Sequence, residues 1–166
     1  SDLSSYATTR TDPLSSKYRD FEINTNHPPG GGVMLLEMLN VLENFNLRDM
    51  THNSSEYIRI VSETMKRATL DKEMFVGDPL FIDVPLEKLL SKEYASEVSN
   101  KIKKNERTFI NRVTQIEPKN TTHVSVIDQE GNCVTMTHSL GMPSGVITDG
   151  LGFMFNGCMA VFDPRP

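Results

Sequence analysis

Hydroxyl and imidazole side chains recur at every second position along two runs of β-type residues late in the chain. The first run carries Thr121, His123 and Ser125, and the second carries Thr135, Thr137 and Ser139. Alternate residues of a strand lie on one face, so each run predicts a polar face. A hydroxyl beside a base can act as the nucleophile of acyl transfer. The other interpretation is the solvent-facing side of an antiparallel sheet, where threonine is common.

A short polar segment between the two runs predicts how they pair. A three-residue loop that ends with Gly131 in the left-handed conformation is a favoured hairpin connection. This loop places Val124 opposite Met136 on an apolar face and Thr121 opposite Ser139 on the polar face. A two-residue loop shifts every pair by one position and mixes the two faces. The hydrophobic pattern therefore favours the first register, in which Thr121 and Ser139 are cross-strand neighbours.

Helices dominate the structure that we expect before this hairpin. Apolar residues recur almost all around the segment 33–45, which predicts a buried helix. Asn53 and Glu56 have the spacing of a capping box and predict the start of a second helix. Ser91 predicts the N-cap of another helix. Near the start of the chain, the segment Tyr18–Ile23 alternates polar and apolar side chains, which predicts a short strand.

Three consecutive glycines, Gly30–Gly32, precede the first expected helix. A glycine-rich loop before a helix can hold a phosphate group. The segment lacks the Lys followed by Ser or Thr that a P-loop needs. We therefore interpret the glycines as the start of a helix at a close-packed site, where a Cβ atom has no room.

Composition and charge exclude several classes of protein. The chain has 166 residues with 37% hydrophobic side chains, and its longest uncharged apolar run, Gly30–Leu36, is far shorter than a membrane span. Its 17 basic and 22 acidic residues give a net charge of -5, which disfavours nucleic-acid binding. Two cysteines, Cys133 and Cys158, are too few for a disulfide scaffold, and we interpret them as buried packing residues. Without a secretory leader in the sequence, we expect a cytoplasmic protein.

The run from Asn120 to Asp128 resembles the processing site of γ-glutamyltranspeptidases and their acylase-like relatives. The resemblance continues through Gly131-Asn132 to Ser139-Leu140-Gly141. Upstream segments are similar to the late part of that family's large subunit: Leu3–Tyr6, Asp12–Leu14, Pro28–Val33, Leu36–Leu42, Gly77–Pro79, Val84–Leu86 and Tyr94-Ala95. Downstream, Gly150–Asn156 is similar to the small subunit. The similarity runs through the whole chain in one order, so it is more specific than a single motif.

This resemblance implies an α+β fold of the N-terminal-nucleophile hydrolase type, an αββα sandwich. The chain supplies part of it, namely large-subunit helices followed by a β-hairpin that carries the nucleophile. Family members are made as zymogens that cut themselves between a large and a small subunit. On this sequence the cut bond is the one between Asn120 and Thr121. Residues 1–120 then belong to the large subunit and residues 121–166 to the small subunit.

The resemblance also assigns roles to residues of the hairpin. Thr121 becomes the nucleophile, and its amine, freed by the cut, acts as the base. Ser139 falls where the family carries a second hydroxyl that hydrogen-bonds the nucleophile, and His123 is expected to be structural. The family's oxyanion-hole glycines correspond to positions beyond Pro166, so we expect this chain alone to be an incomplete catalyst.

Three positions depart from the pattern with which family transpeptidases hold the α-amino end of a γ-glutamyl group. Gly141, Cys158 and Val161 stand where the family carries amide or acidic side chains, and none of the three can balance an ammonium group. An acid from elsewhere, with Asp163 as the candidate, is the alternative. The departures favour an amidohydrolase or acyltransferase that acts on a different small amide or acyl group through an acyl-enzyme.

Two other functions stay open, namely a non-catalytic relative that serves as a binding module and a genuine γ-glutamyl transferase of glutathione metabolism. His27, His52 and His138 show no metal-ligand spacing with one another, and the resemblance implies no metal and no cofactor. The expected partners are a small amide or γ-glutamyl-like substrate, the rest of the chain's own precursor and further copies in a homo-oligomer. No nucleic acid and no membrane is expected among them.

Overall fold

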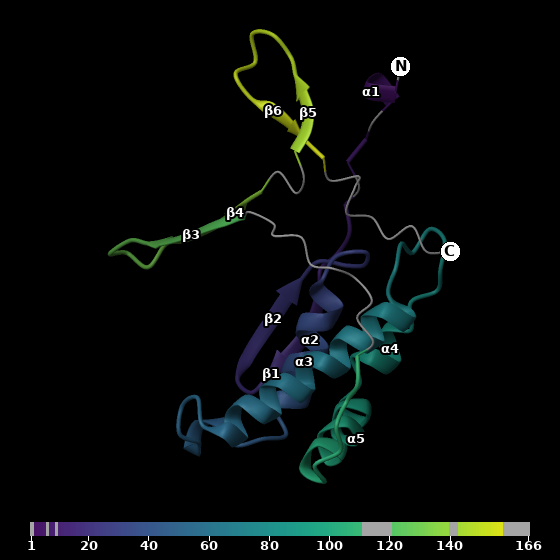
Figure 1. The fold of residues 1–166 in the computed structure, drawn as a ribbon, viewed down its shortest axis with the longest axis vertical. Helices are drawn as coiled ribbons and strands as arrows, with labels where there is room; N and C mark the ends of the chain where they lie inside the picture. Colours follow the sequence, from purple (N-terminus) through teal and green to yellow (C-terminus); the bar gives the residue numbers. More distant parts are fainter. Residues whose placement is uncertain (1, 6, 9, 111–120, 140–142, 158–166) are drawn as a thin grey trace. The chain divides into compact units, whose positions relative to one another are not determined.

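Helices and strands mix in the first part of the chain, and among the described residues strands alone follow in the last part (Figure 1). The computed structural model describes residues 2–5, 7–8, 10–110, 121–139 and 143–157. The chain divides into an N-terminal unit, Ser1–Arg112, and a C-terminal unit, Val113–Pro166. The elements of the N-terminal unit are α1 (Asp2–Ser5), β1 (Leu14–Tyr18), β2 (Phe21–Thr25), α2 (Gly32–Leu42), the 3-10 turn η1 (Leu47–Asp49), α3 (Ser55–Phe75), α4 (Leu86–Leu89) and α5 (Lys92–Lys103). Those of the C-terminal unit are β3 (Thr122–Ile127), β4 (Cys133–His138), β5 (Pro143–Ile147) and β6 (Met154–Asn156).

The first sheet is a hairpin of β1 and β2, and the prediction of one strand over Tyr18–Ile23 is wrong. Tyr18 pairs with Phe21 across a two-residue turn. Arg19 in that turn has a φ of 54°, in the left-handed region, which ends β1. Polar and apolar residues continue to alternate through this turn. The alternation alone therefore could not show that the chain reverses its direction at residues 19 and 20.

The helix caps confirm one prediction and correct another. Ser91 caps α5, because its Oγ accepts a hydrogen bond from the Tyr94 backbone N–H at 3.1 Å. The cap of α3 is Ser54, whose Oγ accepts from the Tyr57 N–H at 3.3 Å, and not Asn53 as predicted. Asn53 has a φ of 58°, whereas an N-cap residue needs the extended conformation that Ser54 adopts.

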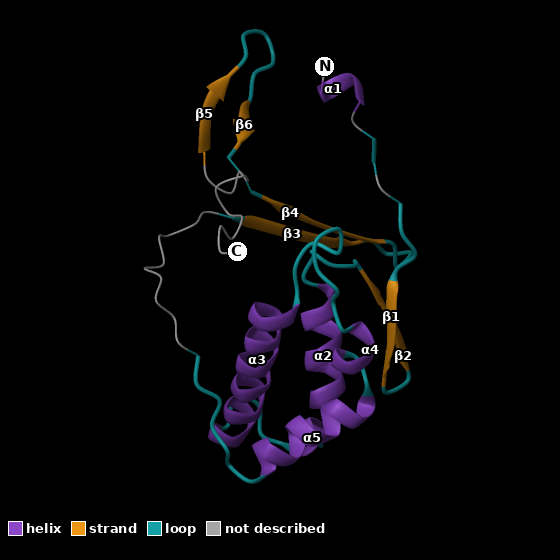
Figure 2. Ribbon diagram, turned by 90° about the vertical axis from the view of Figure 1, so that its right-hand side faces the viewer, coloured by secondary structure: helices purple, strands orange, loops and turns teal. Residues whose placement is uncertain are grey.

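Two apolar clusters form the core of the N-terminal unit, where α2, α3 and α5 pack against one another and β1 packs on α2 (Figure 2). One cluster is made by Val41, Phe45, Ile60, Ala95, Val98 and Ile102. The other is made by Leu14, Val33, Leu36 and Leu89. The half-buried ring of Tyr94 contacts both clusters. The prediction of a buried helix over 33–45 is confirmed for α2, although the helix ends at Leu42 and the buried Phe45 follows it.

The glycines before α2 match the interpretation of a close-packed helix start. A Cβ atom on Gly32 would lie 2.1 Å from the backbone oxygen of Asn26. That distance is far inside van der Waals contact, and the neighbouring atom belongs to the backbone, so glycine is required at this position. A side chain on Gly31 would meet no atom within 4 Å.

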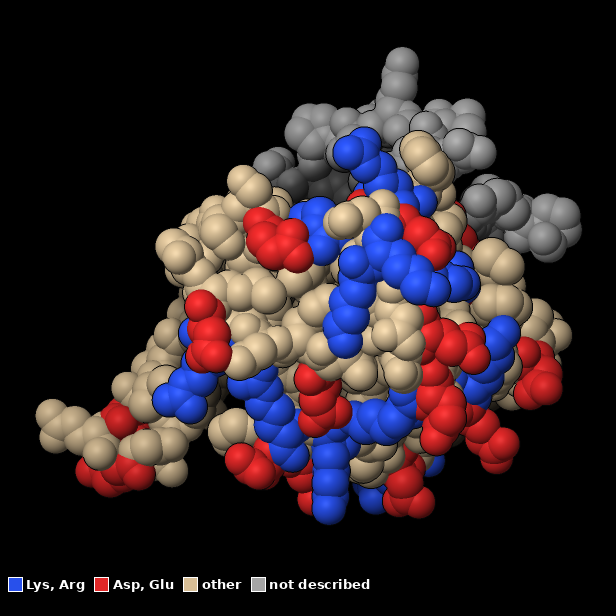
Figure 3. Space-filling view, turned by 90° about the horizontal axis from the view of Figure 1, so that it is seen from below, with Lys and Arg blue, Asp and Glu red and all other residues tan. Residues whose placement is uncertain are grey.

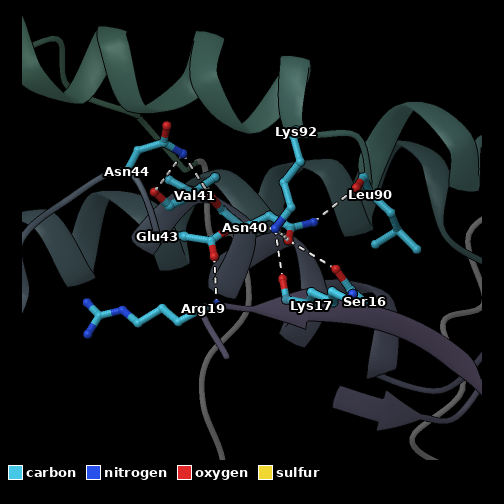
Figure 4. Close-up of polar contacts among 9 residues, drawn as sticks. All are labelled: Ser16, Lys17, Arg19, Asn40, Val41, Glu43, Asn44, Leu90 and Lys92. Carbon is cyan, nitrogen blue, oxygen red and sulfur yellow. Dashed lines mark hydrogen bonds and ion pairs between the residues drawn. The ribbon is translucent and has the colours of Figure 1, made fainter. Parts of the chain in front are cut away.

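The buried Asn40 side chain joins three elements of the N-terminal unit (Figure 4). Its Oδ1 accepts hydrogen bonds from Ser16 Oγ at 3.1 Å and from Lys92 Nζ at 2.7 Å. Its Nδ2 donates to the Leu90 carbonyl at 3.0 Å. Lys92 also forms an ion pair with Glu43 of the segment after α2, at 2.6 Å. These bonds connect β1, α2 and the start of α5. They also satisfy the buried Asn40 amide, which would destabilise the fold if it had no hydrogen-bond partners.

The charged surface is mixed in sign. Basic and acidic side chains are interspersed over the face drawn in Figure 3. Such a face does not build the continuous positive field that attracts a phosphate backbone. Within the described ranges, none of the helices combines the length and the hydropathy that a membrane span requires.

The C-terminal unit contains two antiparallel hairpins in its described part, β3–β4 and β5–β6. Every residue of β3 and β4 is exposed, including the apolar ones. Isolated two-stranded hairpins are at most marginally stable in water. This unit therefore differs from the N-terminal unit, which has its own apolar core.

Candidate active site

The hairpin loop between β3 and β4 has the predicted length and conformation. Gly131 has a φ of 85°, and its N–H donates to the Asp128 carbonyl at 3.2 Å. The Asp128 carboxylate accepts from the Asn132 backbone N–H at 2.8 Å and from Asn132 Nδ2 at 2.7 Å. These hydrogen bonds lower the pKa of Asp128. The backbone carbonyl and the carboxylate of Asp128 thus both bond residues at the far end of the loop, which holds the loop in one conformation. This conformation sets the register of the two strands.

The register of the ladder is the predicted one. Val124 pairs with Met136 and Val126 with Val134, so the apolar side chains share one face. His123 pairs with Thr137, and Ser125 with Thr135, on the opposite face. Because the pattern of one face determines the register, the alternation in the sequence was sufficient to predict these pairs.

Thr121 and Ser139 lie next to each other at the open end of the hairpin. Thr121 directly precedes β3 and Ser139 directly follows β4. The Thr121 Oγ1 hydroxyl donates a hydrogen bond to Ser139 Oγ at 3.1 Å. Both residues are exposed. This geometry places a second hydroxyl where it can orient the first one and exchange a proton with it.

A network of hydrogen bonds continues along the same face. His123 Nδ1 lies 2.8 Å from Thr137 Oγ1, and His123 Nε2 lies 2.9 Å from Thr135 Oγ1 and 3.1 Å from Ser125 Oγ. Both ring nitrogens therefore have hydroxyl partners, and the imidazole links the two strands. The sequence predicted that these residues share a face, but the span of the imidazole over three hydroxyls was not predicted.

Cys133 corrects the interpretation of the cysteines. It is a free thiol at the exposed first position of β4, so it is not a buried packing residue. Cys133 and its neighbour Val134 point to opposite faces of the β3–β4 ladder. Both faces are exposed, so the Cys133 side chain would be exposed on either one. Cys158 lies outside the described residues, as do Asn120, Gly141, Val161 and Asp163.

The described residues contain no group of three or more His, Cys, Asp or Glu side chains placed to hold a metal ion. What the hairpin offers is hydroxyl and imidazole chemistry on one face. A pair of adjacent hydroxyls at the start of a strand can carry out acyl transfer once a base is available. The polar face is therefore the candidate active site.

Comparisons with known proteins show the family to which the chain belongs. The model of the family described as Gamma-glutamyltranspeptidase matches residues 1–166, the whole chain. The chain belongs to the γ-glutamyltranspeptidase family. The predicted resemblance is therefore confirmed, and it includes the segments on both sides of the bond between Asn120 and Thr121.

Individual members of the γ-glutamyltranspeptidase family show the same relationship. The "Glutathione hydrolase proenzyme" of Escherichia coli (strain K12) is 31% identical over 173 residues, which cover 99% of this chain and 30% of that protein. The "Acylase ACY 1 proenzyme" of Pseudomonas sp. (strain V22) is 33% identical over 169 residues, again 99% of this chain and 30% of that protein. The chain thus spans 30% of the length of these two curated relatives. Their names describe a hydrolase and an acylase, each as a proenzyme.

The fold agrees with that of a solved acylase. The crystal structure of cephalosporin acylase from Bacillus halodurans matches with a TM-score of 0.67 and 28% identity, over 93% of this chain and 28% of that chain. The prediction of a partial α+β fold of the N-terminal-nucleophile hydrolase type is confirmed by this similarity and by the order of helices and strands.

Proposed function

We propose that this γ-glutamyltranspeptidase-family chain carries the self-cleavage site and the nucleophile of an N-terminal-threonine amidohydrolase or acyltransferase. The observation that supports the proposal is the hydrogen bond between Thr121 Oγ1 and Ser139 Oγ at 3.1 Å. It pairs the residue that the family motif marks as nucleophile with a second hydroxyl. The motif and the strand register lead to this pair independently of each other.

Self-cleavage proceeds through an ester. Thr121 Oγ attacks the carbonyl carbon of Asn120, and the Thr121 hydroxyl proton passes to the departing nitrogen. The C–N bond breaks as the C–O bond forms, which leaves Asn120 esterified to Thr121 Oγ and frees the Thr121 amine. Water then hydrolyses the ester, so that Asn120 ends as a carboxylate and Thr121 regains its hydroxyl. Ser139 accepts the hydrogen bond that orients Thr121 Oγ for the attack.

The cleavage creates the base for the second reaction. A free α-amine has a pKa of about 7.7–8.0, so a useful fraction is neutral near pH 7. The Thr121 amine takes the proton of its own hydroxyl as the oxygen attacks the substrate amide. The substrate's amine leaves with that proton, and an acyl-enzyme ester remains on Thr121 Oγ. The acyl group is then released by water, which completes a hydrolysis, or by an acceptor amine, which completes an acyl transfer.

The acyl group that we propose is a small one without a required α-amino group. Gly141, Cys158 and Val161 carry no charge that could pair with an ammonium ion, and an unpaired buried charge is costly. The similarity to a protein named as an acylase is consistent with this choice. The rest of the precursor has to supply the oxyanion donors and the walls of the substrate pocket, because this chain spans 30% of the length of its curated relatives.

A γ-glutamyl substrate is the second candidate, favoured by the 31% identity to a protein named as a glutathione hydrolase. Two anilides of similar size separate the candidates, one γ-glutamyl and one with the α-amino group removed. Faster turnover of the desamino anilide supports the first candidate. Turnover of the γ-glutamyl anilide alone, stimulated by an acceptor amine, selects the second.

The intact mass of the full-length protein tests self-cleavage. We expect two fragments whose masses place the cut between Asn120 and Thr121. The Thr121→Ala variant should stay as one chain, because it has no hydroxyl to attack, and Thr121→Ser should be cut again. Thr122→Ala is the matched control: Thr122 pairs with His138, and alternation directs it to the face opposite Thr121, so it should be cut like the parent.

Two results contradict the proposal. One is a single uncut chain for the parent that nevertheless hydrolyses small amides. The other is undiminished cleavage of the Thr121→Ala variant. An uncut parent without activity towards either anilide indicates a non-catalytic relative.

A further inference from the structure

The imidazole of His123 contacts both strands of the β3–β4 ladder. Its Nδ1 lies 2.8 Å from the hydroxyl of Thr137, which is its direct partner across the ladder. Its Nε2 lies 2.9 Å from the hydroxyl of Thr135 on β4 and 3.1 Å from that of Ser125 on its own strand. The Ser125 and Thr135 hydroxyls are also 3.1 Å apart, so the three groups around Nε2 contact one another. His123 is therefore bonded to β4 at two positions of the same face.

Two points of attachment resist a movement that one point allows. A single cross-strand contact can swing as one strand slides, whereas contacts to both Thr137 and Thr135 fix the place of His123 along β4. Directly opposite Cβ atoms are about 4.5–5.5 Å apart, and diagonal neighbours are about 7–8 Å apart. A hydroxyl side chain spans only the first distance, but the longer imidazole side chain spans both. His123 therefore limits the sliding of β3 along β4.

The hydroxyl pair at the open end of the hairpin depends on this alignment. Thr121 and Ser139 lie just outside the ladder, beyond its first pair. Because alternate residues share a face, the nearest ladder pair on the polar face is His123 with Thr137. The Thr121 Oγ1 and Ser139 Oγ atoms are 3.1 Å apart, which is long for an O–H···O hydrogen bond. A further separation of about 0.5 Å breaks such a bond, so a small slide between the strands is enough to remove it.

The partners of the His123 ring favour alignment of the strands over proton transfer. Its two nitrogens lie against the hydroxyls of Ser125, Thr135 and Thr137, and none of these is the proposed nucleophile. A hydroxyl group both donates and accepts hydrogen bonds, so the contacts form with either tautomer of the ring. The link between the strands therefore does not require His123 to take up or release a proton.

We propose that His123 is a positioning residue for the Thr121 nucleophile and that it acts through its bond to Thr137. This bond keeps β3 and β4 aligned, so that Thr121 Oγ1 stays within hydrogen-bond distance of Ser139 Oγ. The role rests on the function proposed for Thr121. His123 contributes no atom to the reaction and acts on it only through the pair of Thr121 and Ser139.

A double-mutant cycle on the self-cleavage of the full-length protein tests this role. Intact mass gives the half-life of the uncut chain in the parent and in each variant. His123→Ala should slow cleavage by about 3- to 10-fold, the loss expected for one hydrogen bond. In the Ser139→Ala background the same change should slow cleavage by less than about twofold, because the bond that His123 maintains is already absent. A residue that stabilises only the fold would slow cleavage equally in both backgrounds.

Conservative variants and a matched control test the assignment to Thr137. His123→Asn places an amide near the position of Nδ1 and keeps a partner for Thr137, whereas His123→Gln places it near Nε2 and keeps one for Thr135. The Asn variant should therefore recover most of the cleavage rate and the Gln variant little of it. His138→Ala is the control: alternation directs His138 of β4 to the face opposite Thr137, so this variant should be cut like the parent.

Equal slowing by His123→Ala in the two backgrounds overturns the proposal. So does a loss greater than that caused by Ser139→Ala, because His123 then acts on more than one bond. If His123→Ala does not fold, the two amide variants decide, and a rate for His123→Gln that equals or exceeds that of His123→Asn overturns the proposal. When the parent is cut and Thr121→Ala is not, each of these results leaves the function of Thr121 standing. A parent that stays uncut contradicts that function itself, and the role of His123 with it.

Discussion

The two units of this chain distribute apolar and polar side chains in opposite ways. The N-terminal unit buries its apolar residues in two clusters and places its polar networks, around Asn40 and Asp71, between helices. The C-terminal unit leaves the apolar face of β3 and β4 exposed and forms its polar network on the other face. In the first unit polar bonds join elements of the fold. In the second they link a row of hydroxyls through one imidazole, on the face that we propose for acyl transfer.

The largest difference between the units should appear when one apolar side chain is shortened in each. Leu36→Ala in α2 removes a 0% exposed side chain and should lower the free energy of unfolding by about 2–5 kcal/mol. Val126→Ala in β3 removes one that is 58% exposed and should change the free energy of unfolding by less than about 0.5 kcal/mol. Urea denaturation of the chain measures both changes. Equal losses for the two variants would show that the face of β3 is covered, and would end the contrast.

A smaller effect is expected at the hairpin loop. Gly131 has a φ of 85°, and an alanine in this conformation costs about 1–2 kcal/mol. Amide hydrogen exchange of β3 and β4 should therefore accelerate by about 5- to 30-fold in Gly131→Ala, while α2 and α3 exchange as in the parent. Gly131→Asn is the matched control, because asparagine tolerates the left-handed region better. Equal acceleration in both variants would exclude backbone conformation as the cause.

The smallest effect is expected for a substitution on the polar face of β3 and β4. It tests most directly whether the polar bonds of the C-terminal unit serve chemistry and not stability. Ser139→Ala removes the acceptor of the Thr121 hydroxyl, a bond worth about 1 kcal/mol, and should slow self-cleavage roughly tenfold or less. The melting of the N-terminal unit should be unchanged. The cleavage half-life of the full-length protein is the measurement. Thr135→Val, four residue pairs farther along the ladder, should slow cleavage less, and a greater loss there would mean that the whole hydroxyl row acts together.

The sequence was most informative where one local rule decides the structure. The alternation of apolar residues, together with Gly131, was enough to predict the pairing of β3 with β4 and the proximity of Thr121 to Ser139. The same holds for the cap at Ser91 and for the glycine at the start of α2. In each case the residues that form the contact are close in sequence or are related by strict alternation.

Predictions were wrong where two local rules compete, and side-chain contacts between residues distant in sequence were not predicted. Asn53 and Ser54 both suit an N-cap, and only the backbone conformation distinguishes them. The hydrogen bond from the Tyr94 hydroxyl to Asp71 joins α5 to α3, and the two residues lie 23 positions apart in the sequence, so no spacing rule reveals it.

The position at which β3 begins has a consequence for the integrity of the hairpin. The ladder starts at Thr122, one residue after Thr121, and its first pair joins Thr122 to His138. A break in the chain before Thr121 consequently removes none of the inter-strand pairs. The strands can keep their alignment when that covalent bond is lost, so the proposed cleavage would create its new chain terminus on a scaffold that is already assembled.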